Sequence, residues 1–298
     1  MSDRSELIEL HNRLSKTLDE ERGAAREKRY EKGYRTAREN LDDLVDKDSF
    51  VEYGQLAIAA QKSRRELEEL RTETAADGII TGFGKINSEI LDDKKALSAI
   101  IINDYSVLAG TQGYYHHKKL DRICETAEKQ NLPVVMYTEG GGGRPGDTDV
   151  HVQFAGLNIP SFSNWAKLKG KSLRIAVNNG YCFAGNAALF GTADFCISTK
   201  NSWLGMAGPA MIEGGGLGKV NPKDIGPAEE QEKLGVIDYL AEDEADATRF
   251  AKKLLSYFQG DLSKWETKDQ SILRNLIPEN RRMAYSVRDI IETIADKD

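Results

Sequence analysis

Four consecutive glycines stand where a strand is expected to end. In VVMYTEGGGGRPGD, residues 134–147, Gly140 to Gly143 directly follow β-branched and apolar residues. Glycine has no Cβ, so the backbone of such a turn can approach a ligand closely, and successive N–H groups can converge on a negative atom. The alternatives for this run are a flexible linker and a tight turn used for packing. If these glycines do chemistry, they do it through backbone amides.

A second turn of the same kind follows in NNGYCFAGNAAL, residues 178–189. Gly180 and Gly185 lie between a strand-like run and a helix of small residues. Two such turns can hold one developing negative oxygen between two N–H groups, which is the arrangement called an oxyanion hole. The first turn lacks the GKS or GKT ending of a phosphate-binding loop, and no acidic residue follows it as a dinucleotide-binding GxGxxG turn would require.

The composition narrows the class of protein. The 298 residues carry a net charge of −7 and a pI near 5.4, so bulk electrostatics argue against a nucleic-acid partner. Three scattered cysteines and four histidines show no disulfide framework and no metal-ligand spacing, so we expect no metal site and a reducing, cytoplasmic location. The sequence shows no apolar segment of signal-peptide or membrane-spanning type, and we expect no membrane partner.

From about residue 78 onward, short apolar runs alternate with helix-like stretches. The strand-like runs are 78–87, 96–104, 132–139, 173–180 and 194–205, and the helix-like stretches are 118–131 and 185–193. This alternation predicts an α/β fold around a largely buried sheet. Residues 1–45 are dense in Glu, Lys, Arg and Leu, which predicts one or two helices with solvated faces.

The sequence contains one internal repeat. Residues 37–48, ARENLDDLVDKD, resemble the last twelve residues, 287–298, VRDIIETIADKD. The matched pairs are Arg38 with Arg288, Leu44 with Ile294, and Asp46, Lys47 and Asp48 with Asp296, Lys297 and Asp298. Two unrelated amphipathic helices can look alike by chance. The other interpretation is a protein built of two similar halves, of which this chain is the first.

Several longer segments occur in an order that resembles a known family. They are VVMYTEGGGGR (134–144), LRIAVNNGYCFAGNAAL (173–189) and TADFCISTKNSWLGMAGPAMI (192–212), with further matches in DKDSFVEYG, ADGIITGFGKIN, NDYSVLAGTQGYYHHKKLDRICETA and LIPENRRMAYSVRDIIETIADKD. The chain resembles the crotonase-like superfamily, and within it the carboxyltransferase (β) subunit of biotin-dependent acyl-CoA carboxylases. The likeness runs from about residue 40 to the end and covers the N-terminal half of that subunit.

The resemblance implies an α/β fold of the crotonase/ClpP-like β-β-α spiral type. We expect an N-terminal helical extension over residues 1–70 and a crotonase-like acyl-CoA carboxyltransferase N-terminal domain over 71–298. The family's subunit is a tandem of two crotonase-like halves, which agrees with the internal repeat.

The reaction implied by the family moves a carboxyl group from carboxybiotin, held on a separate carrier, to the α-carbon of an acyl-CoA. Negative charge then develops on the thioester oxygen. We therefore expect acyl-CoA, a biotin carboxyl carrier and a C-terminal carboxyltransferase half as partners, in a homo- or hetero-oligomer. Two alternatives stay open, a biotin-linked acyl-CoA decarboxylase subunit and a non-catalytic CoA-binding or assembly module. A ClpP-like protease would need a Ser–His–Asp set, and no matching nucleophile turn is present.

The same resemblance implies which positions form the site. Gly141 and Gly142 fall on the family's first glycine pair and Gly185 falls on its second turn, so these three are expected to supply catalytic amides. The expected substrate-binding residues are Gly143, Arg144, Tyr181, Phe183, Ala184, Asn186, Gly208 and Pro209.

The sequence departs from the family at both turns. The family commonly has Ser-Gly-Gly-Ala-Arg where this chain has Gly140 to Arg144, and often Gly-Gly where this chain has Gly185-Asn186. An asparagine there can donate a side-chain hydrogen bond or cap the following helix, and we expect the cap.

Crotonase-type hydratases need two glutamates for acid and base chemistry on water. The aligned positions hold Ala188 and Ala210, while Glu139 and Glu213 stand at other positions in the motifs. The pattern therefore argues against hydratase chemistry.

Some cations keep two interpretations. Arg144 either holds a phosphate or acyl group or pins its loop to a carboxylate such as Asp147. The basic residues of KSRR, 62–65, either meet the phosphates of CoA or form a solvated helix face, and we favour the solvated face.

The histidine pair His116 and His117 is expected to cap a helix or lie on the surface, since adjacent side chains point apart and make a poor metal site. Tyr181 and Phe183 are more typical of core or pocket wall than of chemistry. A third group, Trp203, Met206 and Met211, lines an acyl pocket or a subunit interface, with core packing as the alternative.

Overall fold

The computed structural model describes residues 4–150, 159–261 and 266–295 of the chain. Two compact units make up the chain, Met1–Gly260 and Asp261–Asp298. The domain boundary expected at residue 70 remains a prediction. The last three residues of the repeat, 296–298, lie outside the described residues.

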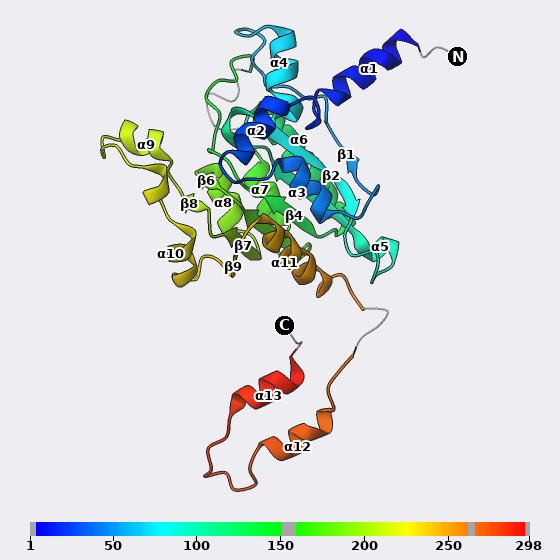
Figure 1. Cartoon of the computed structure of the whole chain (residues 1–298), viewed down its shortest axis with the longest axis vertical. Helices are drawn as coiled ribbons and strands as arrows, with labels where there is room; N and C mark the ends of the chain where they lie inside the picture. Colours follow the sequence, from blue (N-terminus) through cyan, green and yellow to red (C-terminus); the bar gives the residue numbers. More distant parts are fainter. Residues whose placement is uncertain (1–3, 151–158, 262–265, 296–298) are drawn as a thin grey trace. The chain divides into compact units, whose positions relative to one another are not determined.

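A parallel sheet with two antiparallel strands at one edge forms the centre of the first unit (Figure 1). In the described residues its order is β1-β2-β3-β4-β5-β7-β9. The strands are β1 (Val51–Glu52), β2 (Ile79–Lys85), β3 (Leu97–Asn103), β4 (Val134–Tyr137), β5 (Arg174–Asn178), β7 (Phe195–Thr199) and β9 (Tyr239–Ala241). Strands β3 to β9 pair in parallel, whereas β2 is antiparallel to both β1 and β3.

The central strands are apolar on both faces because the sheet is covered on both sides. In β3, Ile100 and Ile102 join one core cluster, while Ala99 and Ile101 join another. Successive side chains of a strand point to opposite faces, so an unbroken apolar run such as LSAIIIN supplies both cores. The strand-like runs that end at residues 87, 104, 139 and 180 therefore become β2 to β5.

Helices cover each face of the sheet. On one face, α3 (Ala37–Leu44) and α11 (Glu244–Ser256) lie side by side and join the first core (Figure 1). On the other face, α6 (Tyr114–Gln130) and α7 (Ser161–Lys167) form the second core with β2, β3 and β4. The remaining α-helices of this unit are α1 (Ser5–Ser15), α2 (Gly23–Tyr30), α4 (Leu67–Glu73), α5 (Asp93–Ala96), α8 (Gly185–Gly191), α9 (Pro209–Gly214) and α10 (Ala228–Lys233). Short 3₁₀ turns are η1 (Ala75–Gly78), η2 (Leu108–Gly110) and η4 (Pro222–Asp224).

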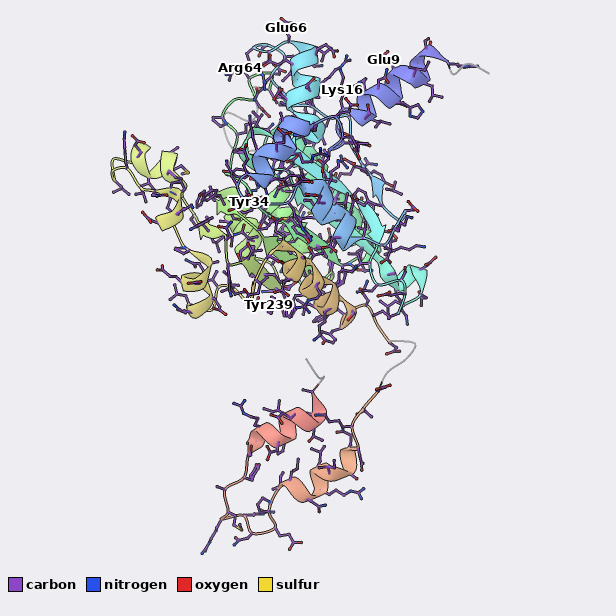
Figure 2. All side chains as sticks on the ribbon, viewed as in Figure 1. Glu9, Lys16, Tyr34, Arg64, Glu66 and Tyr239 are labelled. Carbon is purple, nitrogen blue, oxygen red and sulfur yellow. The ribbon has the colours of Figure 1, made fainter. Side chains whose placement is uncertain are left out.

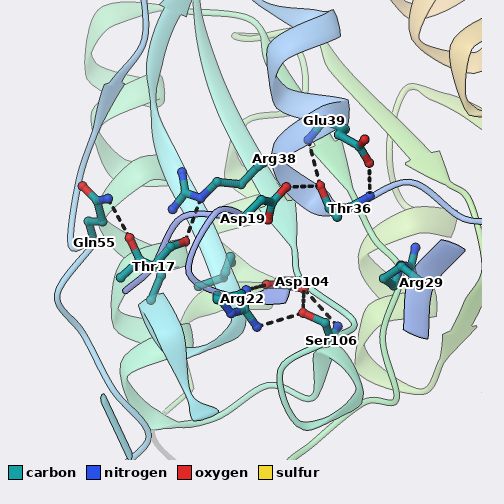
Figure 3. A network of polar contacts seen from close by, with 12 residues as sticks. Thr17, Asp19, Arg22, Arg29, Thr36, Arg38, Glu39, Gln55, Asp104 and Ser106 are labelled. Atoms are coloured by element: carbon teal, nitrogen blue, oxygen red, sulfur yellow. Dashed lines mark hydrogen bonds and ion pairs between the residues drawn. The ribbon is translucent and has the colours of Figure 1, made fainter. Parts of the chain in front are cut away.

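Polar contacts fasten the N-terminal helices to the carboxyl end of β3. Arg22, just before α2, donates to Asp104 at 2.6 Å and to Ser106 at 2.9 Å (Figure 3). The hydroxyl of Thr36 donates to Asp19 at 2.5 Å, and Thr36 also begins α3 with a capping box. These contacts place α2 over the strand ends, where ligands commonly bind in α/β folds.

Each parallel strand continues into a turn, and these turns form a second layer. Strand β6 (Tyr181–Phe183) pairs in parallel with β8 (Trp203–Gly205). Single bridges extend the layer from Cys182 to Gly140 and from Gly143 to Gln112. The chain therefore repeats the order strand, turn and helix. The strand expected at 194–205 is two strands, β7 and β8, because the chain passes from one layer to the other between them.

The second unit contains the second copy of the repeat. It is described by η5 (Gln270–Ile272), α12 (Leu273–Leu276) and α13 (Val287–Ile294). Leu41 and Leu44 of α3 are buried, whereas the matching Ile291 and Ile294 of α13 are 53% and 61% exposed. The apolar face of α13 is thus built like that of α3 and is left uncovered by the described residues of its own unit.

Candidate active site

The two glycine turns pack directly against each other. A Cβ built on Gly142 would stand 2.7 Å from the Cβ of Ala184 and 3.6 Å from the amide nitrogen of Gly185. Gly142 also has a φ of +87°, which residues with a side chain adopt only with strain. Both space and backbone conformation therefore require glycine at position 142.

The first turn uses most of its amides within the protein. The N–H of Gly141 donates to the carbonyl of Ala109 at 3.0 Å, and the N–H of Gly142 donates to Oδ1 of Asn186 at 3.0 Å. The expectation that this pair presents free amides therefore differs from the structure, and a catalytic role for the pair stays a prediction. The N–H of Gly143 is different, because it has no hydrogen-bond partner among the described residues and its position is exposed.

The second turn leaves its amides unpaired. Gly185, Asn186 and Ala187 begin α8, where the first N–H groups have no preceding helical carbonyl to bind, and none of the three has a partner among the described residues. A Cβ built on Gly142 would stand 3.6 Å from the nitrogen of Gly185, and Gly143 is the next residue of the chain. Unpaired N–H groups thus belong to both of the packed turns, and an oxyanion hole uses donors of this kind.

Asn186 connects the turns instead of capping the helix. Its side chain is fully buried, its Oδ1 accepts the N–H of Gly142, and its Nδ2 has no partner in the described part of the chain. The N-cap of α8 is Ala184, which makes no side-chain cap. The expected capping role of Asn186 is wrong, because the packed neighbouring turn offers its carboxamide a closer donor.

Gln112 brackets the first turn and was not identified from the sequence. Its N–H donates to the carbonyl of Gly142 at 2.7 Å, and its carbonyl accepts from the N–H of Arg144 at 3.0 Å. Its side-chain Oε1 lies 2.4 Å from the place a Cβ on Gly185 would take, while Nε2 is buried without a partner in the described residues. Gln112 therefore shapes both turns at once.

Ala184 holds a strained conformation at the centre of the junction. Its φ of +52° and ψ of −118° lie outside the regions that alanine favours, at a cost of about 1–3 kcal/mol. Its N–H is fixed by the carbonyl of Gly205 at 3.0 Å. Strain of this kind is found mainly where the surrounding structure needs one backbone direction for function.

Arg144 pins the first turn to the body of the protein. Its guanidinium is buried, pairs with Asp77 and Asp147, and donates to the carbonyl of Thr111 at 2.7 Å. Burial raises the pKa of Asp77 and Arg144 opposes that rise, so the ion pair keeps a charge inside the protein. Of the two interpretations, loop pinning is the one that the contacts display, and contact with substrate stays a prediction.

Both histidines of the pair are buried, so the expectation of surface placement or capping is wrong. His116 is fully enclosed, with Nδ1 3.3 Å from the carbonyl of Asp77. His117 is 6% exposed, and its Nδ1 lies 2.9 Å from the hydroxyl of Ser161. They face different partners because α6 packs between η1 and α7.

A cavity of about 400 Å³ opens beside α2 at the carboxyl ends of the strands. Its wall includes Tyr181 and Tyr34, the second of which is labelled in Figure 2, and the buried pair of Arg29 with Glu139. The two hydrogen bonds of this pair are 2.9 and 2.8 Å long. Burial raises the pKa of Glu139 while Arg29 opposes the rise. Glu139 immediately precedes the first turn, so the cavity and the turns share their framework.

An aromatic row leads from this cavity to the acyl-pocket candidates. Tyr181 stacks on Trp203 with ring centres 4.8 Å apart, and it lies 5.8 Å from the buried ring of Phe183. A Cβ on Gly208 would stand 3.3 Å from that ring, and Pro209 begins α9 directly after it. The sequence-predicted residues from 181 to 209 therefore lie in one connected region.

The two methionines behave differently from Trp203. Met206 and Met211 are 67% and 62% exposed, whereas Trp203 is 9% exposed. Core packing therefore holds for the tryptophan alone, and the methionines present an open apolar surface.

The carboxylates near the turns are not arranged for hydratase chemistry. Glu139 is held by Arg29, and Glu213 lies on α9 with Lys219 3.7 Å away. Ala188 and Ala210 lie on α8 and α9.

No group of three potential metal ligands occurs among the described residues. Among the same residues, no helix is long and apolar enough to cross a membrane.

The basic segment 62–65 is joined to the loop that follows the first turn. The backbone N–H groups of Lys62 and Ser63 donate to the carboxylate of Asp149 at 2.7 and 2.8 Å. Arg64, shown with Glu66 beside α4 in Figure 2, is exposed. This segment precedes α4, so its cations stand on a turn and not on the expected helix face.

Three features of this site have no clear signal in the sequence. Gln112 binds the backbone of Gly142, and Arg29 pairs with Glu139 just before the first turn. Both partners are distant in the sequence, so only folding brings them together. The GTQG segment before α6 was the one available hint, because a glycine-flanked polar residue often marks close backbone approach. The strained backbone at Ala184 has no sequence signal, because an alanine does not by itself indicate an unusual conformation.

Comparison with protein families places the chain. The model of the carboxyl transferase domain matches residues 28–298, and the chain therefore belongs to that family. This confirms the resemblance to carboxyltransferase subunits of acyl-CoA carboxylases, and the structural likeness below confirms the crotonase-like fold class.

Three similar proteins illustrate the family. The chain is 28% identical to the methylmalonyl-CoA decarboxylase subunit alpha of Veillonella parvula, covering 96% of the chain and 56% of that protein. It is 28% identical to the biotin-dependent acetyl-/propionyl-coenzyme A carboxylase beta5 subunit of Mycobacterium tuberculosis, covering 97% of the chain and 54% of that protein. A solved single-chain, multi-domain long-chain acyl-CoA carboxylase matches with a TM-score of 0.89 and 49% identity, over 98% of this chain and 29% of that one.

The chain thus spans about half the length of the curated relatives it matches. Relatives of this kind are subunits or parts of multi-domain carboxylases.

Proposed function

We propose that this chain is the acyl-CoA-binding half of a biotin-dependent acyl-CoA carboxyltransferase. The observation that carries the proposal is the junction of the two turns, where Gly142 packs against Ala184 and the N–H groups of Gly143 and Gly185 have no partner among the described residues. Membership in the carboxyl transferase family supplies the reaction class.

The proposed chemistry needs no titrating group in this chain. Carboxybiotin would release CO₂, and its ureido nitrogen would take the α-proton of acyl-CoA. The enolate left behind would carry negative charge on the thioester oxygen, and its α-carbon would bond to the CO₂. The amides of Gly143 and Gly185 hold this oxygen, and each such donor contributes about 3–4 kcal/mol to the lowering of the barrier. In this proposal Gly141 and Gly142 shape the turn, while Arg144 keeps it in place.

The residues around the junction would line the substrate-binding site. We assign Tyr181, Phe183 and Ala184 to the wall on one side and Gly208 with Pro209 to the other, in agreement with their connected positions. Two sets of cations are candidates for the CoA phosphates. They are Lys28 and Lys32 at the cavity beside α2, and Lys62, Arg64 and Arg65 before α4.

A second half and a carrier complete the proposed enzyme. The exposed apolar face of α13 supports a partner, because its counterpart α3 buries leucines at the matching positions against a sheet. The exposed side chains of Met206 and Met211 support a further covered surface. We place the protein in the reducing cytoplasm, since all three of its cysteines are free and buried.

Calorimetric titration tests this function. The chain is titrated with acetyl-CoA, propionyl-CoA, palmitoyl-CoA and free CoA, and the palmitoyl ester is included because the similar solved structure is a long-chain acyl-CoA carboxylase. We expect an acyl-CoA to bind at micromolar concentration, and Gly142→Val to weaken it at least tenfold. The titration is repeated after addition of a C-terminal carboxyltransferase half and a biotinylated carrier, called below the assembled enzyme. Absence of acyl-CoA binding in both forms contradicts the proposal.

One alternative uses the same site in the opposite direction. The Veillonella relative is a decarboxylase subunit, so a biotin-linked acyl-CoA decarboxylase has a specific observation in its favour. The assembled enzyme distinguishes the two. Net transfer from carboxybiotin to acyl-CoA supports the carboxylase, and exclusive transfer from a carboxyacyl-CoA to biotin supports the decarboxylase. Binding without transfer in either direction would leave the non-catalytic assembly module.

A further inference from the structure

A buried hydrogen-bond chain links three residues beside the junction. The hydroxyl of Ser161, the first residue of α7, donates to Oδ1 of Asp121 at 2.6 Å. Nδ1 of His117 lies 2.9 Å from the same hydroxyl oxygen. All three side chains are at least nine-tenths buried, at 0%, 6% and 6% exposure. The order Asp–Ser–His differs from a protease triad, because the serine stands between the other two.

The chemistry of these groups fixes the tautomer of His117. A carboxylate can only accept a hydrogen bond, so Ser161 must give its one proton to Asp121. The oxygen of Ser161 can then only accept from the imidazole. His117 therefore carries its proton on Nδ1, and Nε2 has a free lone pair.

Nε2 of His117 has no partner among the described residues, and the residue as a whole is slightly less buried than the neighbouring histidine. Nε2 of His116 is enclosed and unpartnered, while His117 retains 6% exposure. The surroundings also keep His117 neutral. Burial, followed by the charge of Arg144, lowers the pKa of His117 to about 4, with Asp147 opposing and Lys118 adding to the effect. At neutral pH this nitrogen is an acceptor and not a donor.

Phe162 connects this acceptor to the glycine turns. Its ring centre lies 6.3 Å from that of His117, and its Cζ lies 3.1 Å from the place of a Cβ on Gly185. Phe162 is 38% exposed, so this side of the junction is open. The ring of Phe162 therefore lies between His117 and the second glycine turn.

We propose that His117 Nε2 accepts a hydrogen bond from an amide-type N–H of a substrate, and that Ser161 and Asp121 are positioning residues that keep this nitrogen unprotonated. The inference rests on the proposed function, because two substrates of a biotin-dependent carboxyltransferase have such groups. These are the amides of the pantetheine arm of acyl-CoA and the ureido group of biotin. The amide donors of the turns would then bind the substrate oxygen, and His117 would fix its orientation.

Imidazole nitrogen NMR on the full chain, labelled with ¹⁵N-histidine, tests the tautomer directly. Only four histidines contribute signals, and His117→Gln identifies the two ring-nitrogen signals that belong to His117. We expect His117 in the Nδ1–H form at neutral pH, and a shift toward Nε2–H in Ser161→Ala. An Nε2–H tautomer in the wild type, or no change in Ser161→Ala, overturns the inference whatever the enzyme's activity.

Titration of the assembled enzyme identifies the substrate arm. Acetyl-CoA and biotin methyl ester are added separately, and the Nε2 signal of His117 should move with one of them. His117→Leu should weaken binding of that ligand about tenfold (about 1.4 kcal/mol), and His117→Gln, which keeps an acceptor, should restore most of it. Equal unfolding midpoints of the two variants control for a structural effect. If acetyl-CoA binds but neither ligand moves the signal, the inference fails while the proposed function stands. If no acyl-CoA binds, the proposed function fails as well.

Discussion

The two glycine turns meet at one junction but are built in opposite ways. The first turn, 140–143, is held by a charged clamp around Arg144 and by hydrogen bonds of its own amides. The second turn, at Ala184 and Gly185, has a strained backbone and is surrounded by neutral side chains. The N–H groups that begin α8 at Gly185 stay unpaired among the described residues. The glycines of the first turn therefore serve chiefly to let the second turn pack closely against it. The number of glycines in a turn does not indicate the number of donors it offers.

The largest effect in this comparison is expected from Gly142→Val. A branched side chain would need a φ of +87° and would press on the Cβ of Ala184 from 2.7 Å. The separated turns would lose a donor pair, so transfer by the assembled enzyme should fall by about 100-fold or more. Steady-state kinetics and calorimetric binding of acyl-CoA measure the loss.

Gly143→Ala is the matched control for this change. No atom lies within 4 Å of a Cβ at this position, and the N–H is retained. The free energy of unfolding should stay within about 0.5 kcal/mol of wild type, since exposed substitutions of this kind change stability little. An unfolding free energy lowered as much as in Gly142→Val would show that the close contact between the turns is not the cause.

Gly185→Ala should have an intermediate effect that a second substitution relieves. Its Cβ would stand 2.4 Å from Oε1 of Gln112, which is the end of a side chain and can move, unlike the backbone around Gly142. We expect about a tenfold loss of transfer, corresponding to about 1.4 kcal/mol. Adding Gln112→Ala should recover part of it. A double-mutant cycle with no coupling between the two sites would contradict the packing described for the second turn.

Substitutions of Asn186 separate stability from chemistry. Asn186→Gly removes the bond to the N–H of Gly142 and adds a flexible residue to α8, so unfolding should become easier by about 1–2 kcal/mol. Transfer should change little, because the proposed donors at Gly143 and Gly185 remain. Asn186→Asp keeps the acceptor but places a negative charge beside the developing oxyanion. It should lower transfer about tenfold more than glycine does, and the opposite ranking would argue against an oxyanion at this junction.

A pH dependence of stability is expected from His117. The pKa of His117 is lowered to about 4 in the folded chain, against about 6.5 when unfolded. Between these values the unfolded chain binds more protons, so stability falls as pH decreases from 6.5 to 4, by at most about 3 kcal/mol. His117→Gln should flatten this slope in urea unfolding experiments. An unchanged slope would mean that His117 is not the group responsible.

The fold was largely predictable because its strands carry a strong signal. Runs such as LSAIIIN are apolar on both faces and can only be central strands, and β2 to β5 appear where they were predicted. The sequence pattern joins β8 to β7 and leaves β6 within the second turn, since three-residue strands carry too little periodicity to be recognised.

The site was predictable in its location but not in its contacts. Glycine spacing and the family resemblance pointed to the two turns, and those turns do touch. Which amides are free depends on Asn186 and Ala109, which are distant in sequence from the first turn. The burial of His117 was missed for a similar reason, because α7 covers it and the sequence of α6 alone shows no such cover.

The most direct test of the account replaces a single amide by an ester. Exchanging Gly143 for glycolic acid removes one N–H and adds no side chain, and the same exchange at Gly142 removes the N–H that Asn186 already binds. In the assembled enzyme, we expect the ester at 143 to lower the transfer rate by about 100-fold or more with little change in acyl-CoA binding. The ester at 142 should mainly lower stability, by about 1 kcal/mol. Equal rates with the ester at 143 and with the natural amide would contradict the central claim that the junction binds the substrate oxyanion.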